Sequence, residues 1–125
     1  MASGLPPAQP HPTGTPGVGD VYWLDTVCYG GNKKPTRPAV VIRGPIPGLL
    51  DDVIVICRTS KQEYSHTHVR HPADLALGLD RPGAFAKSYR RHVDLGFFTQ
   101  PQFTSYQGQL GEPYLDQILR MTGMA

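Results

Sequence analysis

Three side chains suited to phosphate chemistry stand at the ends of predicted strands. Arg37 lies between a basic loop and a β-branched run, and its planar guanidinium matches a phosphate group. Thr59 and Ser60 end the most apolar run of the chain, where short hydroxyl side chains can point out of the rim of a sheet. A cation stabilises the charge that develops on phosphate oxygens, and a hydroxyl positions the phosphate. The set suits metal-free cleavage of RNA, although Arg-Pro and a Thr-Ser turn are each common in proteins.

Other chemistries have weaker support in the sequence. There is no CxxC pair and no GxxxxGK, HExxH or GxSxG motif. His66, His68 and His71 are the one metal-like cluster, and the first two would share one face of a strand. A zinc site needs further ligands, whereas scattered histidines are frequent on exposed strands. We therefore expect no metal and no cofactor.

Five segments carry the signals of β-strands. Each is rich in β-branched or aromatic residues and is bounded by Gly, Pro or Asn. The run at 52–60 is almost continuous Val and Ile, which indicates a strand covered on both faces. Pro38 can begin a strand but cannot lie within a central ladder, so it marks where the second strand starts. The expected strands are 21–25, 39–43, 52–60, 65–71 and one or two within 83–95.

A helix is predicted at the end of the chain, over 112–121. Leu115, Ile118 and Leu119 have helical spacing, Pro113 suits a first turn, and Gly123 suits the stop. Short strands with Gly/Pro-rich turns, followed by one helix, favour a mainly β fold. The expected form is a small SH3-like antiparallel barrel with the helix packed on it.

The composition separates a tail from a single domain. Residues 1–18 hold five of the thirteen prolines and no charged side chain apart from the titratable His11, which predicts a flexible tail before a domain at 19–125. No apolar run has the length of a membrane span, and the N-terminus lacks the features of a signal peptide. We therefore expect a cytoplasmic protein in which Cys28 and Cys57 are reduced, with Cys57 buried in a strand.

The charge is unevenly distributed along the chain. The net charge is only +2, but eleven of the twelve basic residues and five of the ten acids lie between Lys33 and Arg91. This pattern fits a positive face that holds a phosphate backbone, and it equally fits an ordinary solvated surface.

Taken in order, three segments resemble the MazF/PemK toxins. They are 19–25 (GDVYWLD), 37–42 (RPAVVI) after a Gly-containing loop, and 52–60 (DVIVICRTS). The resemblance continues more weakly to residue 122, through HTHVRH, GLDRPGAFAKSY and GQLGEPYLDQILRM. It implies a homodimeric toxin that cleaves single-stranded RNA at short motifs without metal, leaving a 2′,3′-cyclic phosphate. It also implies an acidic antitoxin as partner.

The resemblance assigns roles to particular residues. Arg37 is expected to stabilise the transition state and assist proton transfer, and Thr59 to bind the phosphate or orient the 2′-hydroxyl. The expected RNA contacts are Lys33, Lys34, Ser60, Lys61 and Lys87. Two features depart from the family pattern. The loop before Arg-Pro carries Lys-Lys where many relatives have Glu-Gln, and Lys87 and Tyr89 stand where one branch has Arg and Asp.

Two other functions remain open on the sequence. The same fold serves non-catalytic toxins such as CcdB, which inhibit a protein target such as gyrase. An SH3-like module that binds peptide or nucleic acid, with the Pro-rich tail as a tether, is the third reading.

Overall fold

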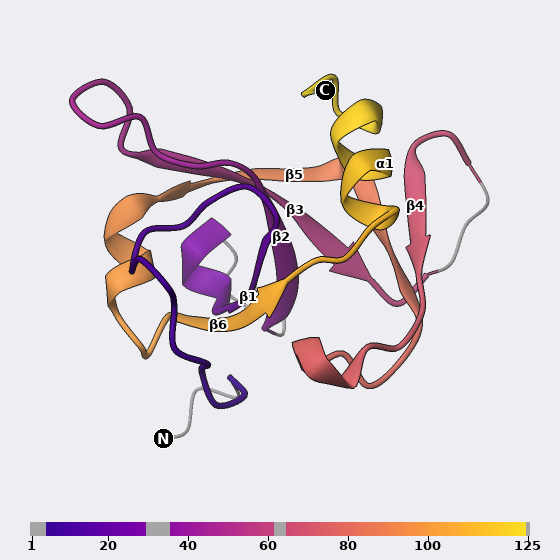
Figure 1. Ribbon diagram of the computed structural model, residues 1–125, viewed down its shortest axis with the longest axis horizontal. Helices are drawn as coiled ribbons and strands as arrows, with labels where there is room; N and C mark the ends of the chain where they lie inside the picture. The colour runs from indigo at the N-terminus through magenta and orange to yellow at the C-terminus, as the bar shows by residue number, and fades with distance from the viewer. Residues whose placement is uncertain (1–4, 30–35, 62–64, 125) are drawn as a thin grey trace.

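The computed structural model describes residues 5–29, 36–61 and 65–124. Over these residues, six strands form one antiparallel sheet in the order β4-β5-β3-β2-β1-β6 (Figure 1). Helix α1 (Tyr114–Met121) follows the last strand, so the prediction of a mainly β fold with a C-terminal helix is confirmed. The strands are β1 (Asp20–Leu24), β2 (Arg37–Arg43), β3 (Asp52–Thr59), β4 (His68–His71), β5 (Gly83–Asp94) and β6 (Thr104–Gln109).

The sheet bends strongly but does not close into a complete barrel. Strands β4 and β6 lie at the two ends of the strand order, and no ladder among the described residues joins them. The bend has a local cause in the long strand β5, whose first part pairs with both β4 and β3 while its later part pairs with β3. The register of the β3–β5 ladder shifts between Ile56 and Arg58, and such bulges bend strands. A barrel is therefore only a loose description of this sheet.

Strand β3 is covered on both faces, as its apolar run predicts. Ile54 and Ile56 belong to the core cluster that includes Ile118 of helix α1. Val53, Val55 and Cys57 point the other way, into a second cluster. That second cluster also holds Cys28, and neither cysteine is disulfide-bonded. The alternation follows from the two-residue period of a strand, and it makes β3 the central wall between two cores.

Helix α1 matches its prediction closely. Pro113 occupies the N-cap position, and Gly123 follows the C-cap with a positive φ of 75°. Ile118 is fully buried, and Leu115 and Leu119 pack against the same core cluster. No helix among the described residues has the length and apolar character needed to cross a membrane.

Strand β6 was not expected from the sequence, and the N-terminal segment lies along it. Ser105 Oγ donates to the carbonyl oxygen of Pro6 at 2.6 Å, and Gln107 Nε2 donates to that of Pro7 at 3.1 Å. The backbone N–H of Gln9 donates to the carbonyl of Tyr106 at 2.8 Å. Residues 6–9 therefore cover the outer edge of β6. They belong to the segment that was predicted to be a flexible tail.

Two further contacts hold this segment at the start of β1. The buried carboxylate of Asp20 is 2.6 Å from His11 Nε2 and accepts the backbone N–H of Gly17 at 2.8 Å. The ring of His11 also packs on Tyr106, with their centroids 4.4 Å apart. We call residues 5–18 the N-terminal strap.

Candidate active site

A cavity of about 390 Å³ opens at the rim where β1 and β3 end and β2 begins. Because neighbouring strands are antiparallel, the end of β3 and the start of β2 meet at the same rim. The segment before β5 closes the other side of the cavity. The lining residues are Trp23, Thr36, Arg37, Pro38, Arg58, Thr59, Ser60, Leu79, Asp80, Arg81 and Pro82.

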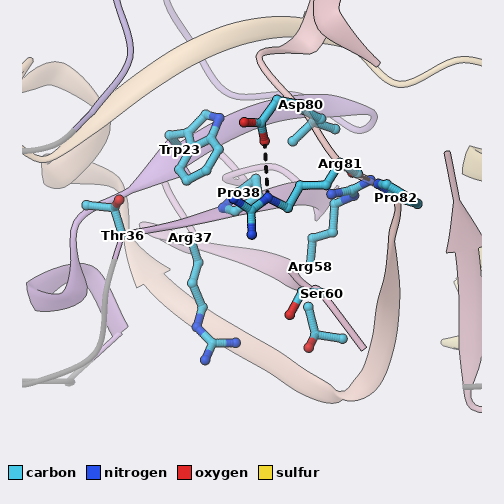
Figure 2. A pocket seen from close by; sticks show the side chains of 11 residues that line it. Trp23, Thr36, Arg37, Pro38, Arg58, Ser60, Asp80, Arg81 and Pro82 are labelled. Atoms are coloured by element: carbon cyan, nitrogen blue, oxygen red, sulfur yellow. Dashed lines mark hydrogen bonds and ion pairs between the residues drawn. The ribbon is translucent and has the colours of Figure 1, made fainter. Parts of the chain in front are cut away.

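Arg37 is the first residue of β2 and lines this cavity, with its side chain extending away from Trp23 and Asp80 (Figure 2). Its backbone is fixed by pairing with Leu24 of β1. Its guanidinium carbon lies 5.5 Å from the centre of the Tyr89 ring, a cation–π arrangement. The charged group is thus half-buried and oriented from a rigid strand, which is the arrangement that an anion-binding group requires.

Thr59 is the last residue of β3, and its hydroxyl is oriented by a local turn. Thr59 pairs with Ala84 of β5, and its Oγ1 accepts the backbone N–H of Lys61 at 3.2 Å. Since that bond uses a lone pair, the hydroxyl proton of Thr59 remains available to donate. Ser60 follows with an exposed side chain and lines the same cavity.

Arg58 is buried beside Thr59 and holds the opposite wall in place. Its Nη2 donates to the carbonyl oxygens of His71 at 3.2 Å, Pro72 at 3.1 Å and Arg81 at 2.9 Å. The same nitrogen lies 3.3 Å from Nδ1 of His71. Burial lowers the pKa of Arg58 from its usual value, yet an arginine stays protonated in proteins. One guanidinium therefore ties together both ends of the 71–82 segment.

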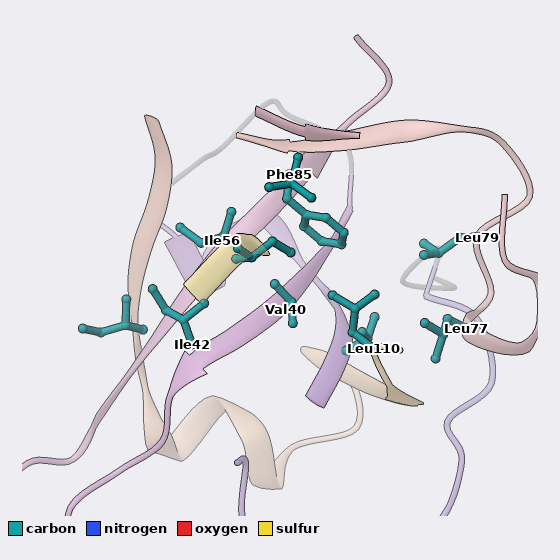
Figure 3. Packing of buried hydrophobic residues seen from close by; sticks show 11 residues of the cluster. Val40, Ile42, Ile56, Leu77, Leu79, Phe85 and Leu110 are labelled. Carbon is teal, nitrogen blue, oxygen red and sulfur yellow. The ribbon is translucent and has the colours of Figure 1, made fainter. Parts of the chain in front are cut away.

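The wall that Arg58 holds carries an exposed pair of opposite charges. Asp80 Oδ1 and Arg81 Nε are 3.8 Å apart, and Figure 2 shows both side chains on the side of the cavity that Trp23 also lines. Leu79, just before them, is buried in the core cluster beside Leu77 (Figure 3). The backbone of this wall is thus anchored in the core while its charged side chains are free.

The predicted site residues fall into three groups. Arg37, Thr59 and Ser60 are brought together in one cavity. Lys61 and Lys87 are exposed, and neither is among the residues that line the cavity. The other two predicted RNA contacts, Lys33 and Lys34, lie outside the described residues.

Eight of the eleven lining residues were not predicted as site residues, and four of the eight have aromatic or charged side chains. Tyr22 and Trp23 are neighbours on β1 and point to opposite faces, so that Tyr22 is buried in the second core while Trp23 lines the cavity. Arg58 is part of the segment 52–60 (DVIVICRTS), but no role was predicted for it. Asp80 and Arg81 lie between the expected strands at 65–71 and 83–95. One sequence signal could have indicated them: the Asp-Arg dipeptide follows Gly78-Leu79 and precedes Pro82. This segment is short, so it must stay close to the rim at which β5 begins.

Comparisons with known proteins identify the fold. No family model matches the sequence, and no curated protein matches it. A MazE-MazF structure from Deinococcus radiodurans matches with a TM-score of 0.62 and 19% identity, over 87% of this chain and 92% of that chain. A MazF structure from the same organism matches with a TM-score of 0.62 and 19% identity, over 87% and 94%. The Mycobacterium tuberculosis toxin MazF-mt6 matches with a TM-score of 0.59 and 15% identity, over 83% and 92%. The chain therefore has the fold of the MazF toxins.

Proposed function

We propose that this chain is a toxin endoribonuclease that cleaves single-stranded RNA at short motifs and needs no metal ion. The observation that carries the proposal is the meeting of Arg37 and Thr59 in one cavity, on a fold shared with MazF toxins. These two residues are separated by 22 positions in the sequence but lie at the same rim of the sheet. A cation and a hydroxyl donor facing one space suit the binding of a phosphodiester.

Arg37 acts in this proposal as the electrostatic group. Its charge persists at any physiological pH, so it stabilises the additional negative charge that develops on the phosphate as the 2′-oxygen attacks. The stacking on Tyr89 restricts the guanidinium before substrate arrives, which reduces the ordering cost of binding. Arg58, another of the three arginines that line the cavity, contributes positive potential without leaving its carbonyl partners.

Thr59 acts as the positioning group. Its oxygen is held by the Lys61 N–H, so its proton can be donated to a non-bridging phosphate oxygen. Attack by the 2′-oxygen forms a new bond to phosphorus as the proton of the 2′-hydroxyl passes to a water molecule. The bond to the 5′-oxygen breaks, and that oxygen takes up a proton from water. The products are a 2′,3′-cyclic phosphate and a 5′-hydroxyl end.

The proposal extends to partners and location. We propose a cytoplasmic homodimer that is inhibited by an acidic antitoxin segment, which would neutralise the arginines around the cavity. Three of the structural matches are MazE-MazF structures, which supports a partner of this kind for the present chain.

The test is cleavage of a mixed-sequence single-stranded RNA in EDTA. Wild type is expected to cut at a short motif and leave cyclic phosphate ends, while Arg37→Ala and Thr59→Ala each lose at least about a hundredfold in rate. Arg120→Ala, an exposed arginine on helix α1, is the matched control and should cut normally. Intact RNA with folded wild-type protein would overturn the proposal. Growth arrest that survives Arg37→Ala would instead favour a protein-binding toxin.

A further inference from the structure

One half of the cavity has no role in the chemistry proposed above. It consists of Trp23, Leu79, Asp80 and Arg81, whereas Arg37, Thr59 and Ser60 make up the other half. In Figure 2, Trp23 and Asp80 are seen on one side of the cavity, with Arg37 and Ser60 on the other. A substrate whose phosphate lies at Arg37 would therefore direct a neighbouring group of the same nucleotide chain toward Asp80 and Arg81.

The backbone of this half is rigid. The carbonyl of Arg81 accepts from Arg58 Nη2 at 2.9 Å, and Asp74 pairs with Leu79 in an isolated bridge. Gly78 has a φ of 69°, and a Cβ there would lie 2.7 Å from Oε1 of Gln107. Only glycine fits this position without strain, so the turn that presents Asp80 is fixed by its sequence.

The charged ends, in contrast, are available to a ligand. The side chains of Asp80 and Arg81 are each 77% exposed, and their 3.8 Å contact is a loose surface ion pair. Such pairs contribute little to stability, so both groups can turn to a ligand at small cost. A fixed backbone with free polar ends is the arrangement of a site that discriminates between ligands.

We propose that Asp80 and Arg81 select a guanine base next to the scissile phosphate, an inference that rests on the proposed ribonuclease function. Guanine alone among the four RNA bases presents two adjacent donors, N1–H and N2–H, which one carboxylate can accept together. Its O6 and N7 are acceptors that suit a guanidinium. A carboxylate beside an arginine therefore matches the two edges of guanine.

The other bases fit this pair less well. Adenine places the acceptor N1 where guanine has N1–H, and cytosine places the acceptor N3 beside its single amino group, so each sets a lone pair against the Asp80 carboxylate. Uracil offers only one donor, N3–H. Single-stranded RNA exposes these Watson–Crick edges, so the difference can be used for recognition.

Trp23 provides a flat apolar surface for the selected base. It is half-buried, lines the same cavity and packs against the core on its other side. Every base can stack on an aromatic ring, so Trp23 contributes to the affinity for RNA without distinguishing the bases. Asp80 and Arg81 then determine which base is preferred. Because it is the only tryptophan of the chain, its fluorescence reports on this cavity alone.

The test measures binding with RNA that cannot be cleaved. Short 2′-O-methyl oligouridines that carry a single central G, A or C are titrated while Trp23 fluorescence is recorded, and equilibrium dialysis provides a second readout. The G oligomer is expected to bind at least about tenfold more tightly than the other two. Asp80→Asn and Arg81→Ala should each remove most of this preference, whereas Asp116→Asn on helix α1 should keep it.

The outcomes separate this inference from the proposed function. Guanine preference without any RNA cleavage would refute the ribonuclease and leave a guanine-binding site. Cleavage with equal binding of all three oligomers, or a preference that Asp80→Asn leaves unchanged, would overturn the guanine assignment. Absence of binding in both fluorescence and dialysis would overturn it as well.

Discussion

Replacing Arg58 by methionine should destabilise the protein strongly, because one buried side chain holds two separate parts of the cavity wall. Methionine keeps much of the volume and apolar stem of arginine but removes the donors. The carbonyls of His71, Pro72 and Arg81 then lose their common partner. The residue itself is only 7% exposed, so at least part of this loss is not replaced by water.

The size of the effect follows from the number of bonds that one nitrogen can make. Nη2 carries two hydrogens, so it satisfies about two of its three carbonyl partners fully at any time. Hydrogen bonds that involve a charged group contribute about 1.5–3 kcal/mol each to stability. Water that enters from the open cavity can bond to the freed carbonyls and so recovers part of this free energy. We expect Arg58→Met to lower the free energy of unfolding by about 2–4 kcal/mol. For a domain of this size that corresponds to a melting temperature lower by roughly 10–20 °C.

The assay is urea unfolding followed through the fluorescence of Trp23. Arg58→Met should lower the urea midpoint with an unchanged slope, and Arg90→Met, an exposed arginine on β5, should leave both unchanged. Arg58→Lys should fall between them, since an ammonium keeps the charge without the planar fork. A loss below about 0.5 kcal/mol in Arg58→Met, the usual range for surface substitutions, would refute the idea that Arg58 anchors the wall.

Three further predictions concern the strap, the buried histidine and the thiols. Deletion of residues 1–12 should lower the free energy of unfolding by about 1–3 kcal/mol, because it removes the hydrogen bonds to β6. Urea unfolding measures this loss, and an unchanged urea midpoint would show that the strap is dispensable for stability. Burial and the neighbouring Arg58 charge lower the pKa of His71, so the unfolded state binds this proton more readily, and stability should fall as pH drops below about 6.5. Urea midpoints between pH 7.5 and 5 should therefore fall less in His71→Gln than in wild type, and equal slopes would contradict this. Burial raises the pKa of Cys28 to about 12, so Cys28 and the equally buried Cys57 should react with a thiol reagent only after unfolding; rapid labelling of native protein would refute their burial.

The strands that could be predicted are those whose own residues provide their burial. β2 and β3 are continuous apolar runs, and each was predicted within two residues of its observed bounds. The segment 83–95 also forms a single long strand, β5. In these cases the hydrophobic pattern is local, so a reading of the sequence can detect it.

Strand β6 could not be predicted because its burial depends on another part of the chain. Its buried residues include Thr104, Ser105 and Gln107, which have the polarity of a loop. Ser105 and Gln107 donate to carbonyls far away in the sequence, those of Pro6 and Pro7. The composition of the strap likewise gives no sign that β6 offers hydrogen-bond donors at the right spacing.

The candidate site was predictable only on one side. Arg37 and Thr59 stand at strand ends, and antiparallel pairing of those strands places them together. Asp80 and Arg81 reach the same cavity through a loop whose path depends on the Arg58 side chain, and that contact crosses between distant segments. A motif can name the residues at the end of a strand, but it does not reveal which loop closes over them.

The adjacency of Arg58 and Thr59 links the two halves of the cavity through the end of one strand. Successive side chains of a strand point to opposite faces, so Arg58 turns toward the 71–82 wall while Thr59 turns toward Arg37. A change that shifts the end of β3 therefore alters the hydroxyl proposed for catalysis and the wall proposed to contact the base together. Asp80, whose side chain is exposed and whose backbone is fixed elsewhere, can change the preferred base alone. In such an arrangement residues of the wall can alter the preferred base while the proposed catalytic pair on the sheet stays unchanged.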